Sequence, residues 1–141
     1  MILVLDTSGA LAAIDRAAAE HDAAKRVLAK ETGPILLSPF VLAELDYMLL
    51  TRIGLRAELT FLQQVGDGAY NLIPVAHQDV GEAADLIETY AGMKIGLTDA
   101  SVALVAARHR TTRVLTLDQR HFRTMKPLWG DTFTVLPADE G

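Results

Sequence analysis

Four acidic residues occupy positions from which carboxylates can do chemistry: Asp6, Glu44, Asp99 and Asp118. Asp6 and Asp118 each directly follow a short apolar run, and Asp99 opens a helical segment after a glycine-bounded loop. Carboxylates brought together repel one another and are costly to desolvate. A hard divalent cation, Mg²⁺ or Mn²⁺, is the natural compensation because both ions prefer oxygen ligands. Such a cation activates a water and polarises a phosphoryl oxygen, so these residues indicate hydrolysis of a phosphate ester.

Three of these carboxylates also have a structural interpretation. Asp6 can cap the helix that follows it. Asp99 can be a first-turn acid that the helix dipole favours, and Asp118 can begin an Asx turn. Residue types alone leave both interpretations open.

Glu44 is the acid that is hardest to explain structurally. It lies within a predicted helix, one turn after Phe40-Val41 and directly before the segment 45–49. Its helix face is therefore predicted to be largely apolar, and a glutamate is rarely buried unless it is paired or binds a ligand. We expect a functional role for Glu44, whereas Asp46, on a different face, is expected to be a solvated acid.

Residues 108–126 are strongly basic in a chain whose net charge is −5. The segment holds six lysine and arginine residues and a single acid, Asp118. A mildly acidic protein can still present a basic rim to phosphate groups. The alternative is a set of solvated charges at helix ends and turns. The histidines of the chain are scattered without metal-ligand spacing. His121, close to Asp118, can touch a substrate, but a solvated turn residue is the expected role.

The elements that must position these residues alternate along the chain. Strands are predicted at residues 2–5, 35–37, 70–75, 113–117 and 133–136. Helices are predicted after the capping segment Thr7-Ser8-Gly9 and at residues 21–30, 39–52, 56–65, 79–90 and 99–110, with Ser38 and Thr98 as N-caps. This alternation predicts a single α/β domain over residues 1–141 with a mainly parallel sheet. Functional groups gather beyond the carboxyl ends of such strands, where the four acids can converge.

The bulk properties exclude several other classes of protein. A chain of 141 residues can bury a core without disulfides or structural metal ions, and half of its residues are hydrophobic. The chain has no cysteine, which excludes disulfides, thiolate zinc sites and cysteine nucleophiles. No apolar run is long enough for a membrane span, and the N-terminus lacks the basic start of a signal peptide. We expect a cytoplasmic protein without a membrane partner.

Each of the four acids lies in a short segment of distinct sequence. The segments are residues 4–8 (VLDTS), 38–45 (SPFVLAEL), 95–100 (IGLTDA) and 115–122 (LTLDQRHF). In this order, and over essentially the whole chain, they resemble the PIN-domain nucleases, in particular the VapC toxins of bacterial toxin–antitoxin pairs.

The resemblance implies a PIN-like three-layer sandwich, in which helices flank a five-stranded, mainly parallel sheet. It implies that the four carboxylates bind Mg²⁺ or Mn²⁺, some directly and some through water, and that the protein cleaves RNA endonucleolytically. Small hydroxyl side chains match positions around such sites: Thr7, Ser8, Thr98 and Thr116. Thr98 and Thr116 can orient ligands or waters, although a helix cap or a strand position accounts for either residue equally well.

The resemblance also implies partners. Relatives usually form homodimers and are silenced by a cognate VapB-like antitoxin whose basic side chains enter the acidic pocket. The predicted function is the toxin of such a pair, an endoribonuclease that cleaves structured RNA, tRNA or rRNA, through a metal-activated water. The side chains predicted to contact RNA phosphates are Arg108, Arg110, Arg120 and Arg123.

Other functions fit the residues less well. The haloacid-dehalogenase pattern needs a second acid two residues after Asp6, where this chain has Ser8. A receiver domain needs a lysine after a late strand, and residues 115–118 offer none. The chain has neither the Gly-x-Ser-x-Gly elbow of serine hydrolases nor a P-loop. The remaining alternative is a catalytically silent PIN-like domain that binds RNA or a partner without cleavage.

Overall fold

The structure, a computed structural model, describes residues 1–140 and contains one five-stranded sheet. Its strands are β1 (Leu3–Leu5), β2 (Ile35–Leu37), β3 (Asn71–Leu72), β4 (Arg113–Leu115) and β5 (Thr134–Leu136). They lie in the order β3-β2-β1-β4-β5, and every neighbouring pair is parallel. β1 is therefore central, with Val4 opposite Leu36 on one side and Val114 on the other. The predicted α/β fold with a parallel sheet is confirmed.

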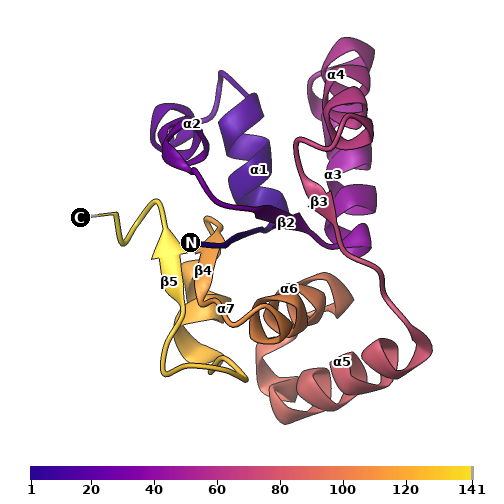
Figure 1. The fold of residues 1–141 in the computed structure, drawn as a ribbon, viewed down its shortest axis with the longest axis vertical. Helices are drawn as coiled ribbons and strands as arrows, with labels where there is room; N and C mark the ends of the chain where they lie inside the picture. The colour runs from indigo at the N-terminus through magenta and orange to yellow at the C-terminus, as the bar shows by residue number, and fades with distance from the viewer. Residues whose placement is uncertain (141) are drawn as a thin grey trace.

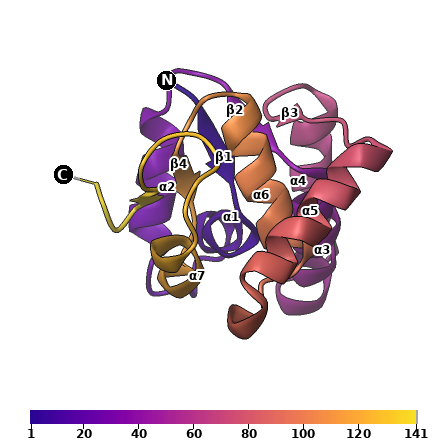
Figure 2. The same ribbon diagram turned by 90° about the horizontal axis from the view of Figure 1, so that it is seen from below.

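Seven α-helices cover this sheet in the described part of the chain. They are α1 (Thr7–Ile14), α2 (His21–Lys30), α3 (Pro39–Arg52), α4 (Leu55–Gly66), α5 (His77–Thr89), α6 (Leu97–Arg108) and α7 (Gln119–Thr124), and a 3₁₀ turn covers Ala91–Met93. Figure 1 shows α1 to α4 on one side of the sheet and α5 and α6 on the other, which gives the three expected layers. Figure 2 looks onto α6, with α5 packed beside it. Across residues 1–140, no helix has the length and apolar character needed to span a lipid bilayer.

The core explains why the buried parts of the central strands are apolar. All three residues of β1 are fully buried, and so are Val114 and Leu115 of β4. Helices cover both faces of such a strand, so it has no solvent side and no polar alternation. Gly9 completes the packing, because a Cβ on this residue would lie 2.3 Å from the Leu115 carbonyl oxygen. A residue without a side chain therefore allows the start of α1 to approach the end of β4.

Four strands are shorter than predicted: β1 and β5 by one residue each, and β3 and β4 by more. β3 consists only of Asn71–Leu72 instead of residues 70–75, because it is an exposed edge strand and Pro74 cannot donate to a ladder. β4 ends at Leu115 rather than at residue 117. Beyond this point side-chain hydroxyl groups replace the neighbouring strand as hydrogen-bond acceptors. The Leu117 amide donates to Ser8 Oγ and the Asp118 amide donates to Thr116 Oγ1, each at 2.9 Å.

Several helix ends also differ from the prediction. α5 begins at His77 rather than at Asp79, because the Asp79 side chain accepts a 2.7 Å hydrogen bond from the Ala76 amide at the helix start. α6 begins at Leu97, so Gly96 is the N-cap and Thr98 lies within the first turn. The short helix α7 is absent from the prediction. It begins directly after Asp118, whose side chain caps it by accepting from the His121 amide.

Candidate active site

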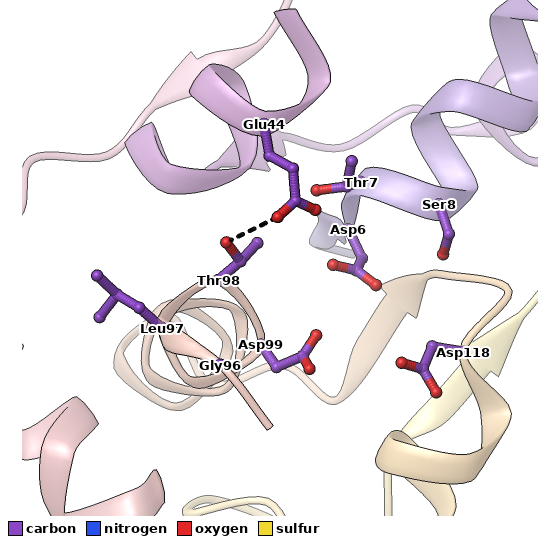
Figure 3. A pocket seen from close by; sticks show the side chains of 9 residues that line it. All are labelled: Asp6, Thr7, Ser8, Glu44, Gly96, Leu97, Thr98, Asp99 and Asp118. Carbon is purple, nitrogen blue, oxygen red and sulfur yellow. Dashed lines mark hydrogen bonds between the residues drawn. The ribbon is translucent and has the colours of Figure 1, made fainter. Parts of the chain in front are cut away.

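An open pocket lies beyond the carboxyl ends of β1 and β4 (Figure 3). Its volume is about 430 Å³. The residues that line it are Asp6, Thr7, Ser8, Glu44, Gly96, Leu97, Thr98, Asp99 and Asp118. The structure thus brings all four predicted carboxylates together, although they come from four separate segments of the chain.

The parallel sheet accounts for two of the four positions. Asp6 follows β1 and Asp118 lies three residues after the end of β4, and these two strands are neighbours, so both side chains reach the same edge. The Asp6 amide donates to the Leu115 carbonyl at 3.0 Å, which continues the ladder by one bond. Asp99 enters from the first turn of α6 and Glu44 from α3. In Figure 3 the carboxylates of these residues surround one open space.

Asp6 is the most deeply buried of the four acids, with 4% of its surface exposed. Burial raises the pKa of Asp6 to about 7, and the charges of Asp99 and Asp118 add to that increase. Hydrogen bonds from the Thr116 side chain and the Thr7 backbone act in the opposite direction. Asp6 occupies the N-cap position of α1, but its side chain makes no capping hydrogen bond there. Its carboxylate is therefore held for the pocket rather than for the helix.

Thr116 connects the sheet to Asp6. Its hydroxyl donates a 2.7 Å hydrogen bond to Asp6 Oδ2 and accepts from the Asp118 amide. The Ser8 hydroxyl lies 3.2 Å from the Thr116 hydroxyl oxygen and itself accepts from the Leu117 amide. Since a hydroxyl has one proton and two lone pairs, Thr116 uses its full hydrogen-bonding capacity. Ser8 and Thr116 thus fix the backbone after β4 together with the Asp6 side chain.

Thr7 behaves differently from these two residues. Thr7 begins α1 and lines the pocket, yet its buried hydroxyl has no hydrogen-bond partner in the described residues. The expectation that Thr7 and Ser8 serve as helix caps is wrong, because α1 starts at Thr7 without a side-chain cap.

Glu44 reaches the pocket from an exposed position, so the expectation of an apolar environment for it is wrong. The buried positions of α3 are Val41, Leu45 and Leu49, one per helical turn, and Glu44 lies beside this stripe. Thr98 Oγ1 donates to Glu44 Oε2 at 3.3 Å across the pocket (Figure 3). Thr98 therefore contacts an acid instead of capping α6.

Asp46 is the acid on α3 that does become partly buried, which corrects the expectation of a solvated side chain. Its Oδ1 atom is inaccessible and has no hydrogen-bond partner among the described residues. It faces Glu58 of α4, and a hydrogen bond with Asp46 raises the pKa of Glu58. The packing of α3 against α4 brings these two acids together, away from the pocket.

The expectation that His121 is a solvated turn residue is wrong, because His121 lies in α7, is partly buried and faces two of the site carboxylates. Its Nδ1 atom lies 3.0 Å from Asp99 Oδ2 and 2.8 Å from Asp118 Oδ2. The pKa of Asp99 is raised above its usual value, mainly by burial and also by the charge of Asp118. His121 acts in the opposite direction. The signal available in the sequence is the spacing of three residues from Asp118 to His121, which places both on one side of a helical turn. That signal depends on α7, which the sequence pattern did not reveal.

The predicted RNA-contacting arginines are dispersed. Arg108 is the last residue of α6, about 14 Å along the helix from Asp99, and Arg110 lies two residues beyond the helix end. Arg108 pairs with Asp79 and Glu82 there. The structure therefore does not bring Arg108 and Arg110 to the pocket, because the helix that carries Asp99 at one end carries them at the other.

The other two arginines lie on α7, next to the acid that caps this helix. Arg120 is exposed, and no ion pair involves it within residues 1–140. Arg123 is paired with Asp139, and this interaction lowers the pKa of Asp139. Among the described residues, Arg120 thus carries a charge without an ion pair two residues after Asp118.

The donor atoms in the pocket fit a divalent cation. Ligand atoms of Asp99, Asp118 and His121 all lie within 4.8 Å of one another. His121 Nδ1 is buried without a hydrogen-bond partner in the described chain, and Asp6 is a buried carboxylate without a neighbouring base. Carboxylate oxygens are the usual ligands of Mg²⁺ and Mn²⁺, and an imidazole nitrogen is a common ligand of transition metals.

Comparison with known proteins identifies relatives over most of the chain. The family model described as PIN domain matches residues 3–126. A curated relative, ribonuclease VapC26 of Mycobacterium tuberculosis strain H37Rv, is 38% identical over 135 residues, which cover 96% of this chain and 100% of the relative.

Solved structures show the same fold at lower sequence identity. The VapC20 toxin of Mycobacterium tuberculosis, described as cleaving the sarcin–ricin loop, superposes with a TM-score of 0.77 and 22% identity over 82% of this chain and 89% of that chain. VapBC2 from Rickettsia felis, bound to a DNA fragment from its promoter, gives a TM-score of 0.67 and 22% identity over 96% and 98% of the two chains.

Proposed function

The chain belongs to the PIN-domain family, and we propose from this membership and from its pocket that it is a divalent-metal-dependent endoribonuclease, the toxin of a toxin–antitoxin pair. One observation carries the proposal: four carboxylates from four separate segments line a single open pocket. A purely structural role for each acid does not account for this convergence, because the repulsion among the charges has to be compensated.

We assign the four carboxylates to the binding of Mg²⁺ or Mn²⁺. The bound cation would supply an activated water and would stabilise negative charge on the phosphodiester. Asp6, Asp99 and Asp118 line the pocket from the edge of the sheet and from α6, and Glu44 lines it from α3. Thr116 orients the Asp6 carboxylate and Thr98 orients Glu44 through their hydrogen bonds.

The proposed substrate is a structured RNA, of the tRNA or rRNA class. The 38% identical relative, VapC26, is named a ribonuclease, and VapC20, which shares the fold, is described as cleaving the sarcin–ricin loop. The open shape of the pocket suits an exposed loop, whose phosphates are accessible from several sides. We propose that Arg120 on α7 contacts a phosphate of the bound RNA. Arg123 would do so if its ion pair with Asp139 were replaced by one with a phosphate.

We propose two protein partners, a cognate antitoxin and a second copy of the chain. The antitoxin is supported by VapBC2 of Rickettsia felis, a toxin–antitoxin pair of which one chain matches almost all of this protein. Large apolar side chains are exposed on α3, on α4 and on their connection: Tyr47, Leu50, Ile53, Leu55, Leu59 and Leu62. Exposed apolar patches of this kind mark protein interfaces. This surface is therefore assigned to the partners, while the pocket is assigned to RNA.

The test is cleavage of labelled structured RNA by the purified chain, with Mg²⁺ added or removed by EDTA. Asp99→Asn removes one carboxylate charge, and we expect cleavage to fall by at least a hundredfold. Asp85→Asn, on the exposed face of α5, is the matched control and should cleave normally. Undiminished cleavage by the Asp99→Asn variant, or in EDTA, would contradict the proposal. A protein that neither cleaves nor gains thermal stability with Mn²⁺ would instead be a silent binding domain.

A further inference from the structure

The side chain of His121 is anchored on both sides. Nε2 lies 3.1 Å from the backbone carbonyl oxygen of Met93, and Nδ1 faces Asp99 and Asp118. A carbonyl oxygen only accepts hydrogen bonds, so Nε2 must carry the hydrogen and donate it. In the neutral ring this leaves a lone pair on Nδ1, directed at the acidic pocket.

A lone pair between two carboxylates is an unfavourable arrangement unless a proton or a metal ion lies among the three groups. Nδ1 is close to both oxygens but makes no hydrogen bond of acceptable geometry within residues 1–140, and the atom is buried. An imidazole that binds a metal through one nitrogen commonly donates its other N–H to a backbone carbonyl, which fixes the ring. The Met93 carbonyl provides that contact here.

The separations of the donor atoms also match those in a coordination shell. Two ligands at right angles on an ion with bonds of about 2.1 Å lie about 3 Å apart. Nδ1 of His121 is 2.8 Å from Asp118 Oδ2 and 3.0 Å from Asp99 Oδ2. The three atoms are therefore spaced as ligands of a single ion would be.

We propose that His121 Nδ1 is a nitrogen ligand of the divalent cation, bound together with Asp99 and Asp118. The inference rests on the proposed metal-dependent function and extends it by one ligand and by ion preference. An imidazole ligand favours transition metals over Mg²⁺, which prefers an all-oxygen shell. The site should consequently bind Mn²⁺ more tightly than Mg²⁺, and His121 should be the cause of that preference.

Pulsed electron paramagnetic resonance on the full chain loaded with Mn²⁺ tests this directly. A directly bound imidazole gives a nitrogen modulation, which should change to the ¹⁵N pattern when the protein is grown with ¹⁵N-histidine. His121→Gln should abolish the modulation, and His77→Gln, at an exposed position on α5, should retain it. The isotope experiment uses the wild-type protein, so it decides the question even if the His121 variant does not fold.

Affinity measurements separate the inference from the function on which it depends. Titration calorimetry should show that His121→Gln weakens Mn²⁺ binding by about tenfold or more and Mg²⁺ binding by less. Bound Mn²⁺ without nitrogen modulation would overturn the histidine ligand and leave the nuclease proposal standing, because the carboxylates would then hold the ion without His121. Absence of any Mn²⁺ binding would overturn both.

Discussion

The Thr116 hydroxyl donates a 2.7 Å hydrogen bond to the carboxylate of Asp6, joining the segment after β4 to the buried acid after β1. No basic side chain contributes to lowering the pKa of Asp6. The hydrogen bonds from the Thr116 hydroxyl and the Thr7 backbone are the interactions that favour its charged form. The orientation of the most buried carboxylate therefore depends on a hydroxyl more than 100 residues away in the sequence.

We expect Thr116→Val to weaken metal binding while leaving the fold intact. The substitution keeps the shape of the side chain but removes the donor to Asp6 and the acceptor for the Asp118 amide, at a cost of about 1–3 kcal/mol in stability. Calorimetric titration should give a Mn²⁺ dissociation constant raised by roughly tenfold or more. Thr112→Val is the control, since its hydroxyl meets Thr134 at 3.5 Å, outside the pocket. Equal metal affinities for the two variants would contradict this role for Thr116.

The metal-free protein should lose stability as pH rises, because of Asp6. Its pKa is raised from 3.8 to about 7 on folding, so the folded state holds a proton that the unfolded state has released. This contribution to stability is fully present below about pH 4 and is lost as pH rises through 7. Urea denaturation in EDTA at pH 4.5, 6 and 8 measures the effect.

Asp6→Asn is the comparison for that experiment, because it removes the carboxyl group of residue 6. All other titratable groups are the same in both proteins, so a difference between their pH profiles reports on Asp6. We expect Asp6→Asn to approach the wild-type stability at pH 4.5 and to exceed it at pH 8. A stability difference that stays constant with pH would show that Asp6 ionises normally in the fold.

Glu44→Gln should separate activity from stability. The side chain is exposed, so its neutral amide should change the unfolding free energy by no more than about 0.5 kcal/mol. Loss of one carboxylate from the pocket should still reduce RNA cleavage by at least tenfold. Glu88→Gln, exposed on α5, serves as the control for charge alone. Thermal melts and cleavage rates of both variants decide the matter, and normal cleavage by Glu44→Gln would remove Glu44 from the site.

Gly9→Ala should be strongly destabilising. Its Cβ would lie 2.3 Å from the Leu115 carbonyl oxygen, a backbone atom that cannot move without displacing β4. Displacing β4 would also shift Ser8 and Thr116, so metal affinity should fall together with the melting temperature. Gly81→Ala, in the middle of α5 with no atom within 4 Å of the added Cβ, should raise stability by up to about 1 kcal/mol. A Gly9→Ala protein as stable as the wild type would show that α1 does not need this close approach.

The salt dependence of RNA binding should come from arginines on α7 rather than from those at the end of α6. Arg120→Ala should lower the slope of log affinity against log salt by about one, because one phosphate contact is lost. Arg110→Ala should leave the slope unchanged, since Arg110 follows the end of α6 that lies away from the pocket. Filter binding to the inactive Asp99→Asn variant at several salt concentrations provides the slopes. The reverse result would place the RNA along the other end of α6.

The sequence by itself determined the architecture, and it identified Asp6 and Asp118 as acids at one edge of the sheet. Apolar residues such as Leu3-Val4-Leu5 and Val114-Leu115 predict buried parallel strands, and an acid beyond such a strand lies at the functional edge of the sheet. These two inferences need only local pattern and connectivity. Glu44 and Asp99 do not directly follow a strand, and their place in the set came from the resemblance of the four segments to PIN-domain nucleases.

Only the tertiary structure decided how the other side chains relate to those acids. The Thr116 bond to Asp6, the position of His121 between Asp99 and Asp118, and the exposure of Glu44 are contacts between segments that lie far apart in the chain or depend on the unpredicted α7. The basic segment 108–126 is continuous in sequence but is divided between the two ends of the fold, because α6 ends where the segment begins and β4 crosses the sheet before α7 starts. Charge along a chain predicts charge on a surface only where the backbone does not carry the residues to opposite ends.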